Sequence, residues 1–155
     1  MTTAADEKTS TLIIGVGNGW RGDDAVGLVV ARRIQEKRLP HVRAIEQDGN
    51  PSALIHALQE AHAVFVIDAL QAGASPGRIV RLDASREPIA RDFGPSSGHS
   101  FGVAQAIETA RALNQLPERL IVYGIEGKNF ALGAPVSFEI EQAAEAVLDR
   151  LLQEI

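Results

Sequence analysis

Two adjacent carboxylates, Asp23 and Asp24, end a glycine-rich stretch that runs from residue 15 to residue 24 with the sequence GVGNGWRGDD. An apolar run precedes this stretch, and apolar residues at helical spacing follow it. Two like charges placed side by side repel each other, and a bound cation would offset that repulsion. The pair therefore predicts a site for a hard or borderline divalent cation.

Other polar residues stand at comparable points of the chain. Asp68 directly follows the apolar run 63–67, His99 closes a long irregular stretch, and Glu126 follows the last predicted strand. A carboxylate at the end of a buried strand is poorly solvated unless something pairs with it. Two carboxylates and one imidazole, with open positions, form a reasonable site for a divalent transition metal. Thiolate ligands and disulfides are excluded because the chain has no cysteine.

Each of these residues also has a purely structural explanation. Asp24 could cap a helix, and Asp23 could be a charge that is favourable near a helix N-terminus. Asp68 could cap a following turn, and His99 could be a cap or a surface residue. Trp20 could dock a partner or plug its own loop.

The pattern of strands and helices would bring these residues together. Apolar and β-branched runs predict strands over 11–16, 42–46, 63–67, 78–82 and 119–125, and helical spacing predicts helices over 24–39, from Asn50-Pro51, over 100–113 and over 138–155. This alternation predicts an α/β fold, a single three-layer αβα domain over 11–155 with a mainly parallel twisted sheet, after a disordered lead at 1–10. The strand at 78–82 follows its predecessor after only a turn, so we expect an antiparallel edge strand. Ligands of such sheets bind at the carboxyl ends of the strands, where all the polar residues above would lie.

The composition argues against several classes of partner. Fifteen basic against twenty acidic residues give a net charge of −5, which disfavours nucleic acid as a partner. The apolar runs are too short to cross a membrane, and the polar N-terminus is no signal peptide. We therefore expect a monomeric cytoplasmic protein with no membrane partner.

Three other functions compete with a metal-dependent enzyme. The first is nucleotide binding, but the glycine spacing only roughly matches the dinucleotide fingerprint. The acidic pair would also face the pyrophosphate of the nucleotide, which carries the same charge. A phosphoacceptor receiver domain, a signalling module, would use the acidic pair, Asp68 and a lysine such as Lys128, but it gives His99 no role. A non-catalytic metal-dependent binding module would use the same edge of the sheet to dock a partner.

The chain resembles the [NiFe]-hydrogenase maturation proteases from Thr11 to the last helix. The resemblance lies in residues 15–27, in Ile67-Asp68-Ala69, in His99 before an apolar helix, and in Val122-Tyr123-Gly124-Ile125-Glu126. It implies an endopeptidase, a hydrolase that trims the C-terminus of the hydrogenase large-subunit precursor. It also implies that Asp24, Asp68 and His99 contact the metal and are the catalytic residues. The ligand at the position of Asp24 is glutamate in some members of the family and aspartate in others.

The resemblance further implies how the substrate is recognised. Nickel already carried by the precursor would be the recognition signal, and other divalent metals would substitute in vitro. Asp48, Gly49 and Asn50 resemble a segment implicated in choosing the substrate, but Asn50-Pro51 stands where many members have glycine and threonine. The identity of the hydrogenase therefore stays open.

The chemistry of the cleavage also stays open. The metal could activate a water and polarise the scissile carbonyl, or a carboxylate could act directly as general base. A serine nucleophile is not indicated, because Ser96, Ser97 and Ser100 lie beside His99 without a recognisable nucleophile elbow.

Overall fold

A five-stranded sheet forms the centre of the molecule in the computed structural model, which describes residues 9–89 and 98–155. Its strands run in the spatial order β2-β1-β3-β5-β4. They are β1 Thr9–Val16, β2 Val42–Gln47, β3 Ala61–Leu70, β4 Ile79–Asp83 and β5 Arg119–Glu126. The predicted α/β fold class is confirmed.

Four of the strands are parallel to one another. β1 pairs in parallel with β2 on one side and with β3 on the other, and β3 pairs in parallel with β5. β4 pairs antiparallel with β5 at the edge of the sheet, as the short connection to β3 predicts. The carboxyl ends of β1, β2, β3 and β5 therefore share one edge, which we call the carboxyl edge.

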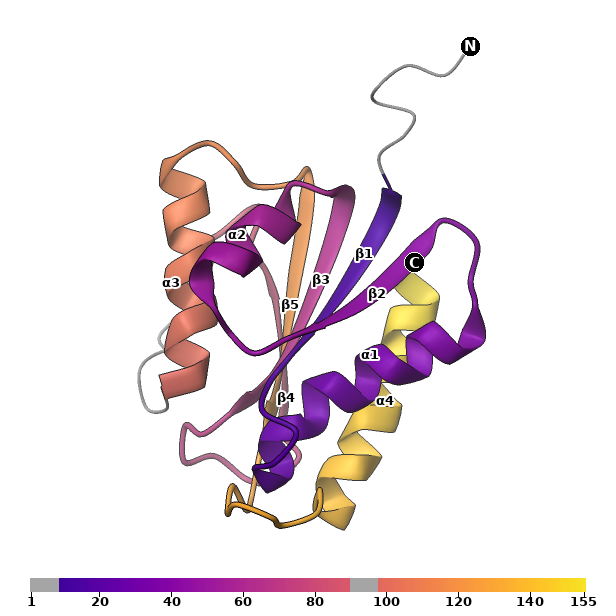
Figure 1. The fold of residues 1–155 in the computed structure, drawn as a ribbon, viewed down its shortest axis with the longest axis vertical. Coiled ribbons are helices and arrows are strands. Elements are labelled where there is room, and N and C mark those ends of the chain that lie inside the picture. The colour runs from indigo at the N-terminus through magenta and orange to yellow at the C-terminus, as the bar shows by residue number, and fades with distance from the viewer. Residues whose placement is uncertain (1–8, 90–97) are drawn as a thin grey trace.

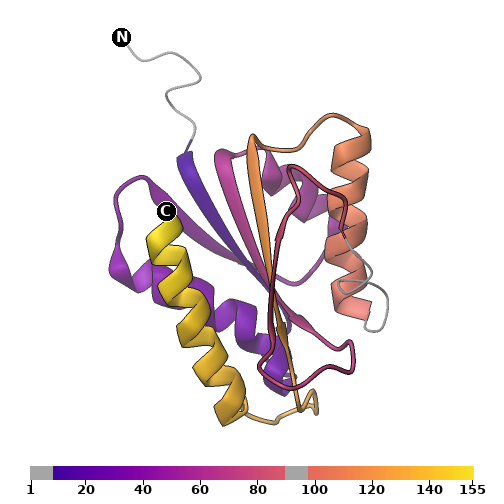
Figure 2. The same cartoon turned by 180° about the vertical axis from the view of Figure 1, so that it is seen from behind.

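Helices cover both faces of the sheet (Figures 1 and 2). α1 (Val26–Lys37) and α4 (Phe138–Glu154) lie on one face, and α2 (Pro51–Leu58) and α3 (Gly98–Ala112) lie on the other. Alternate residues of each strand point to opposite faces, so Ile13 packs under α1 and α4 while Leu12 and Ile14 pack under α2 and α3. No helix within residues 9–89 and 98–155 is long and apolar enough to span a membrane.

Four strands, β1, β2, β3 and β5, are longer than the sequence predicts. β3 continues to Leu70 instead of ending at Ile67, because Asp68 and Leu70 still pair with Gly124 and Glu126 of β5. Asp68 consequently lies within β3 and Glu126 is the last residue of β5, so neither is the first residue of a loop. β1 begins at Thr9, which pairs with Ala61, so this strand starts two residues before the predicted one.

The helix starts show where local signals succeed and fail. Asn50 caps α2 as predicted, since its side chain accepts a hydrogen bond from the Ala53 N–H. The helix predicted from Asp24 begins instead with a short 3₁₀ turn, η1 (Gly22–Ala25), before α1. Ser137 lies at the N-cap position of α4, but its hydroxyl makes no capping hydrogen bond and donates to Asp23.

Candidate active site

The carboxyl edge has a topological switch point between β1 and β3. The chain leaves β1 to reach β2 on one side and later returns as β3 on the other, which opens a crevice beyond the ends of the two strands. Asp24 lies in η1, which follows β1 after the loop of residues 17–21, and Asp68 lies near the end of β3. The fold therefore brings two of the predicted site residues to the place where ligands of such sheets bind.

Gly27 allows η1 to sit this close to the sheet. A Cβ atom at Gly27 would lie 2.3 Å from the Ile67 carbonyl oxygen and 2.7 Å from that of Val16, so no larger residue fits. The first turn of α1 consequently rests on the backbones of both β1 and β3. This contact explains why a glycine stands three residues after the acidic pair and why η1 overlies the strand ends.

Asp24 is 2% exposed and lies near enough to Asp68 for its charge to act on that carboxyl group. Its Oδ2 accepts a hydrogen bond of 2.9 Å from the Asn18 N–H, within the glycine-rich loop. Neither η1 nor α1 has a side-chain cap, so the interpretation of Asp24 as a helix cap is wrong. The loop instead orients the Asp24 carboxylate toward the strand ends.

Asp68 is buried with few donors around it. Its Oδ1 accepts a hydrogen bond of 2.8 Å from the neighbouring Ala69 N–H, and Oδ2 is buried without a hydrogen-bond partner among the described residues. Burial raises the pKa of Asp68 well above its ordinary value, and the nearby charge of Asp24 raises it further. The turn-capping explanation is wrong, because the carboxylate lies within β3 and receives no hydrogen bond from the following turn among the described residues.

Asp23 is also fully buried but has a full set of donors. The N–H groups of Lys128 and Asn129 donate to Oδ2 at 2.8 Å each, the Ser137 N–H donates to Oδ1 at 2.6 Å, and the Ser137 hydroxyl donates to Oδ2 at 2.9 Å. Burial by itself would raise the pKa of Asp23, but the hydrogen bonds from Ser137, Asn129 and Lys128 outweigh it and lower the pKa. Asp23 therefore ties the loop between β5 and α4 to the start of η1. The prediction of a charge near a helix N-terminus is confirmed, since Asp23 lies in the first turn of η1 and its carboxylate accepts from the N–H of Ser137, the N-cap residue of α4.

His99, the third predicted ligand, belongs to the first turn of α3, and its side chain lies outside the described part of the structure. The backbone of the next turn can be placed: a Cβ atom at Gly102 would lie 2.9 Å from the Gly49 carbonyl oxygen, and one at Gly49 would lie 3.6 Å from Val16 Cγ1. The start of α3 thus approaches the carboxyl edge near the end of β1. Among the described side chains alone, no three histidines or carboxylates are grouped as a metal site.

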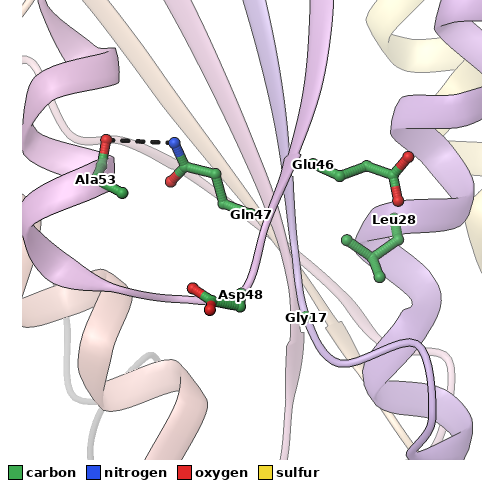
Figure 3. A pocket seen from close by; sticks show the side chains of 6 residues that line it. All are labelled: Gly17, Leu28, Glu46, Gln47, Asp48 and Ala53. Atoms are coloured by element: carbon green, nitrogen blue, oxygen red, sulfur yellow. Dashed lines mark hydrogen bonds between the residues drawn. The ribbon is translucent and has the colours of Figure 1, made fainter.

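Asp48 lines a pocket of about 380 Å³ next to this crevice (Figure 3). The pocket walls come from the ends of β1 and β2, from α1 and from α2, and its lining residues are Gly17, Leu28, Glu46, Gln47, Asp48 and Ala53. The other two residues of the predicted substrate-choosing segment have structural roles. Gly49 takes a φ of +95°, which favours glycine, and Asn50 caps α2. Of the three, only Asp48 presents its side chain to the pocket.

Comparison with known proteins decides the family. The family model for hydrogenase maturation proteases matches residues 29–155, a range that includes Asp68 and His99 and begins just after the glycine-rich loop. The chain belongs to the hydrogenase maturation protease family. It is therefore a hydrolase of peptide bonds, as the sequence predicts.

Curated relatives agree with this assignment. HupD of Rhodobacter capsulatus, a hydrogenase expression/formation protein, is 30% identical in an alignment of 144 residues, and the match covers 88% of this chain and 69% of that protein. A putative hydrogenase maturation protease of Methanocaldococcus jannaschii is 24% identical over 155 residues and spans 96% of this chain and 98% of its own.

Solved structures share the fold. The hydrogenase maturating endopeptidase HybD from Escherichia coli superposes with a TM-score of 0.77 at 22% identity, covering 94% of this chain and 91% of that one. The [NiFe] hydrogenase maturation protease HybD from Thermococcus kodakarensis gives a TM-score of 0.76 at 23% identity, covering 93% and 97%.

The strand order of this maturation protease excludes the phosphoacceptor receiver fold. Doubly wound receivers have the strand order 2-1-3-4-5, whereas this sheet has the order β2-β1-β3-β5-β4 with an antiparallel edge. Lys128, the candidate receiver lysine, pairs its ammonium group with Glu139 at 2.9 Å.

Trp20 is 77% exposed, so it does not plug its loop.

Glu126, which the sequence places at the end of the last strand without giving it a role, is a buried carboxylate. It accepts hydrogen bonds from the Ala72 N–H at 2.9 Å and the Ala74 N–H at 3.0 Å, and so it shapes the turn after β3. Asn18, which orients Asp24, is a second residue without an assigned role in the sequence. Glu126 carries the same sequence signal as Asp68, a carboxylate at the end of an apolar strand, but its hydrogen bonds make it a structural residue.

Proposed function

We propose that this maturation protease removes a C-terminal peptide from the precursor of a [NiFe]-hydrogenase large subunit after nickel has been inserted. Nickel carried by the precursor would be the recognition signal, so the metal belongs to the substrate. The precursor would be the only macromolecular partner, with neither nucleic acid nor membrane involved, and the protease would act as a cytoplasmic monomer. The observation that carries the proposal is the buried pair of Asp24 and Asp68, in which Asp68 Oδ2 has no donor among the described residues.

The chemistry of this pair suits a cation. Two carboxylates that repel each other in a buried crevice are stabilised when a metal ion enters between them. Carboxylates together with an imidazole are acceptable ligands for nickel and for other first-row divalent metals, which supports substitution by such metals in vitro. Asp24, Asp68 and His99 would hold the nickel of the precursor at the carboxyl edge.

Recognition and cleavage would be linked by position. A precursor tail whose nickel is held at Asp24 and Asp68 has its backbone fixed beside the same crevice, and fixing a substrate in this way lowers the barrier to its reaction. The nickel would also polarise the scissile carbonyl. Asp24, Asp68 and His99 would thus serve as recognition residues and as catalytic residues at once.

The decisive experiment is a cleavage assay on two forms of the precursor. Purified protease is mixed with nickel-loaded and with nickel-free large-subunit precursor, and the product masses are read by mass spectrometry. We expect loss of a short C-terminal peptide only from the nickel-loaded form. Equal cleavage of both forms would refute nickel as the signal, and an unchanged nickel-loaded precursor would favour a non-catalytic binding module.

Variants of the three residues test the assignment of the site. Asp24→Ala, Asp68→Ala and His99→Ala are each expected to abolish trimming while the far-ultraviolet circular dichroism spectrum stays that of the folded protein. Asp149→Ala, on the exposed face of α4, is the matched control and should trim normally. Full activity of His99→Ala would remove that residue from the site.

A further inference from the structure

A second pocket, of about 390 Å³, borders the glycine-rich loop and has no role in the proposal above. Its lining among the described residues consists of Gly19, Trp20, Ala25, Leu28 and Arg32. These residues come from the loop after β1, from η1 and from α1, and none of them belongs to the segment 48–50 that follows β2. We call this second pocket the tryptophan pocket.

The tryptophan pocket adjoins Asp24 of the candidate active site. Asn18 donates its N–H to Asp24 Oδ2 at 2.9 Å, and the next two residues of the loop, Gly19 and Trp20, line the pocket. Ala25, which directly follows Asp24, lines it as well. A group bound in the pocket would therefore lie beside a group held at Asp24.

The backbone of Trp20 is fixed on both sides although its side chain is exposed. The Trp20 N–H donates to Asn18 Oδ1 at 2.9 Å, and the Trp20 carbonyl oxygen accepts a hydrogen bond of 2.7 Å from the Gly133 N–H. Trp20 is nevertheless 77% exposed, and Leu132, the neighbour of Gly133, is 72% exposed. Exposed apolar side chains that lie together on a surface are typical of interaction sites, and tryptophan is enriched among the residues that contribute most to binding.

The lining of the pocket favours a flat and uncharged group. Ala25 and Leu28 provide apolar surface, and Trp20 provides the face of an indole ring. Arg32 is already paired, because its Nε donates to Glu46 at 3.1 Å and its Nη2 lies 2.8 Å from the same carboxylate. The charge of Arg32 is therefore balanced, while the plane of its guanidinium can still stack on an aromatic ring. An aromatic side chain matches this lining better than a charged side chain does.

The position of the pocket favours the precursor as its occupant. In the proposed function the precursor holds its nickel at Asp24, so neighbouring residues of the precursor must pass along the loop that lines the pocket. A second copy of the chain seated on Trp20 would cover the same edge of the sheet and would hinder the precursor from reaching Asp24. The pocket is thus best suited to a side chain that arrives together with the nickel.

We infer that the tryptophan pocket binds an aromatic side chain of the precursor close to the cleaved bond, with Trp20 as the main contact. The inference rests on the proposed function for the identity of the substrate. It makes Trp20 a specificity residue that recognises an apolar feature of the precursor, in addition to the recognition of nickel by Asp24 and Asp68.

A binding experiment tests the pocket without cleavage. Trp20 is the single tryptophan of the chain, so protease labelled with 5-fluorotryptophan gives one ¹⁹F NMR signal that reports on the pocket. The labelled protein is titrated with N-acetyl-phenylalanine methylamide and, separately, with the non-aromatic N-acetyl-cyclohexylalanine methylamide. We expect the phenylalanine compound to reach its half-maximal shift at about threefold lower concentration, as for an aromatic pair. Equal concentrations for both compounds, or no shift, would overturn the inference.

A variant that fills the pocket is the control for this titration. A Cβ atom at Gly19 would lie 3.7 Å from Leu28 Cδ1, which is an ordinary contact, so Gly19→Leu is expected to occupy the pocket without displacing the loop. It should abolish the shift caused by the phenylalanine compound. Leu113→Ala removes an exposed apolar side chain directly after α3 and should leave the shift unchanged. A shift that persists in Gly19→Leu would place the binding elsewhere and would overturn the inference.

Cleavage of nickel-loaded precursor tests the same contact in the reaction. Trp20→Ala and Gly19→Leu are each expected to lower kcat/KM about tenfold, mainly through KM, because the contact binds the substrate and the transition state alike. Trp20→Phe keeps an aromatic ring and should stay within about twofold of the wild type. Leu113→Ala should cleave normally. Wild-type kcat/KM in both Trp20→Ala and Gly19→Leu would overturn the inference and leave the proposed function intact.

An alanine scan of the precursor identifies the bound side chain. Each precursor residue flanking the cleaved bond is changed to alanine in turn and is cleaved by wild-type and by Trp20→Ala protease. We expect one change, at an aromatic residue, to cost the wild type about tenfold in kcat/KM and to cost Trp20→Ala nothing further. Additive losses at every position would overturn the inference.

Two further outcomes separate the inference from its alternatives. A ¹⁹F signal that shifts with protease concentration alone, together with a doubled mass in sedimentation, would assign the pocket to a second copy of the chain and would overturn the inference. If wild-type protease leaves nickel-loaded precursor uncut, the proposed function fails, and the inference, which takes its substrate from that function, fails with it. The titration with the phenylalanine compound then shows whether the pocket itself binds an aromatic ring.

Discussion

Asp23 and Asp68 are both buried aspartates, yet their surroundings move their pKa values in opposite directions. Asp23 accepts hydrogen bonds from Lys128, Asn129 and Ser137, and its pKa is lowered. Asp68 accepts one from Ala69 and lies near the charge of Asp24, and its pKa is raised. Burial alone therefore does not determine the state of a carboxylate, because the number of donors that face it can outweigh the loss of water.

The difference separates structural from reactive carboxylates. A carboxylate whose oxygens are all hydrogen-bonded holds loops together and has little left to offer a ligand. A buried carboxylate with an unpaired oxygen and a like charge beside it is a candidate for binding or catalysis. Glu154, far along the chain, is of the first kind, since Arg81, Arg119 and Tyr123 all contact its side chain.

The largest effect should come from neutralising the reactive pair. Asp68→Asn is expected to lower cleavage of nickel-loaded precursor about a thousandfold, the equivalent of about 4 kcal/mol. The reason is that an amide is a poor metal ligand, so that Asp24 would be the one remaining carboxylate of the pair. Its free energy of unfolding should stay the same or rise, since a buried and repelled charge is gone. Single-turnover kinetics and urea unfolding measure the two quantities. A variant that stays active but unfolds more easily would place Asp68 with the structural carboxylates.

Asp23→Ala should show the reverse pattern. It leaves the N–H groups of Lys128, Asn129 and Ser137 without their acceptor, so we expect the free energy of unfolding to fall by about 3–5 kcal/mol. Cleavage per folded molecule should fall far less than in Asp68→Asn. Urea unfolding followed by circular dichroism gives the stability. A loss below about 1 kcal/mol would mean that the hydrogen bonds of Asp23 contribute little.

The pH dependence of stability should separate the same two residues in metal-free protein. The lowered pKa of Asp23 means that the unfolded chain binds more protons below the ordinary value of 3.8, so Asp23 contributes stability above that pH that is lost as the pH falls further. The raised pKa of Asp68 means that the folded chain binds more protons from 3.8 upward, so stability decreases as the pH rises toward the folded pKa of Asp68.

Urea unfolding from pH 3 to pH 8, with Asp68→Asn and Asp23→Asn as comparisons, measures these slopes. Asp68→Asn should remove the decrease above pH 3.8, by about 1.4 kcal/mol for each pH unit over which it occurs. Asp23→Asn should remove part of the loss of stability at low pH. Parallel curves for Asp68→Asn and the wild type would show that Asp68 titrates normally.

The smallest effect concerns Glu154, the structural carboxylate at the end of α4. Burial, and then the hydrogen bond to Glu154, raise the pKa of Tyr123 from 10.0 to about 12. Because Tyr123 is the single tyrosine of the chain, an ultraviolet absorbance titration reports on it alone. Glu154→Gln should lower the midpoint without changing cleavage at neutral pH. An unchanged midpoint would assign the whole shift to burial.

Much of the architecture follows from local patterns. The alternation of apolar runs and helical periods predicts the α/β fold, the short link before β4 predicts its antiparallel edge position, and Asn50-Pro51 predicts the start of α2. These features depend on neighbours within a few residues, which the sequence displays directly. The glycine-rich loop with its acidic pair, Asp68 and His99 likewise identify the carboxyl edge as the candidate site.

The different roles of Asp23, which is structural, and Asp24, which belongs to the candidate site, could not be predicted in this way. The two residues are adjacent and chemically identical, and the donors that saturate Asp23 lie 105, 106 and 114 residues further along the chain. The end of β3 depends in the same way on its pairing with β5, which places Asp68 inside the strand. Sequence alone determined which residues could do the chemistry. Only the tertiary structure decided which of them have all their hydrogen bonds made, because those donors come from segments distant in sequence.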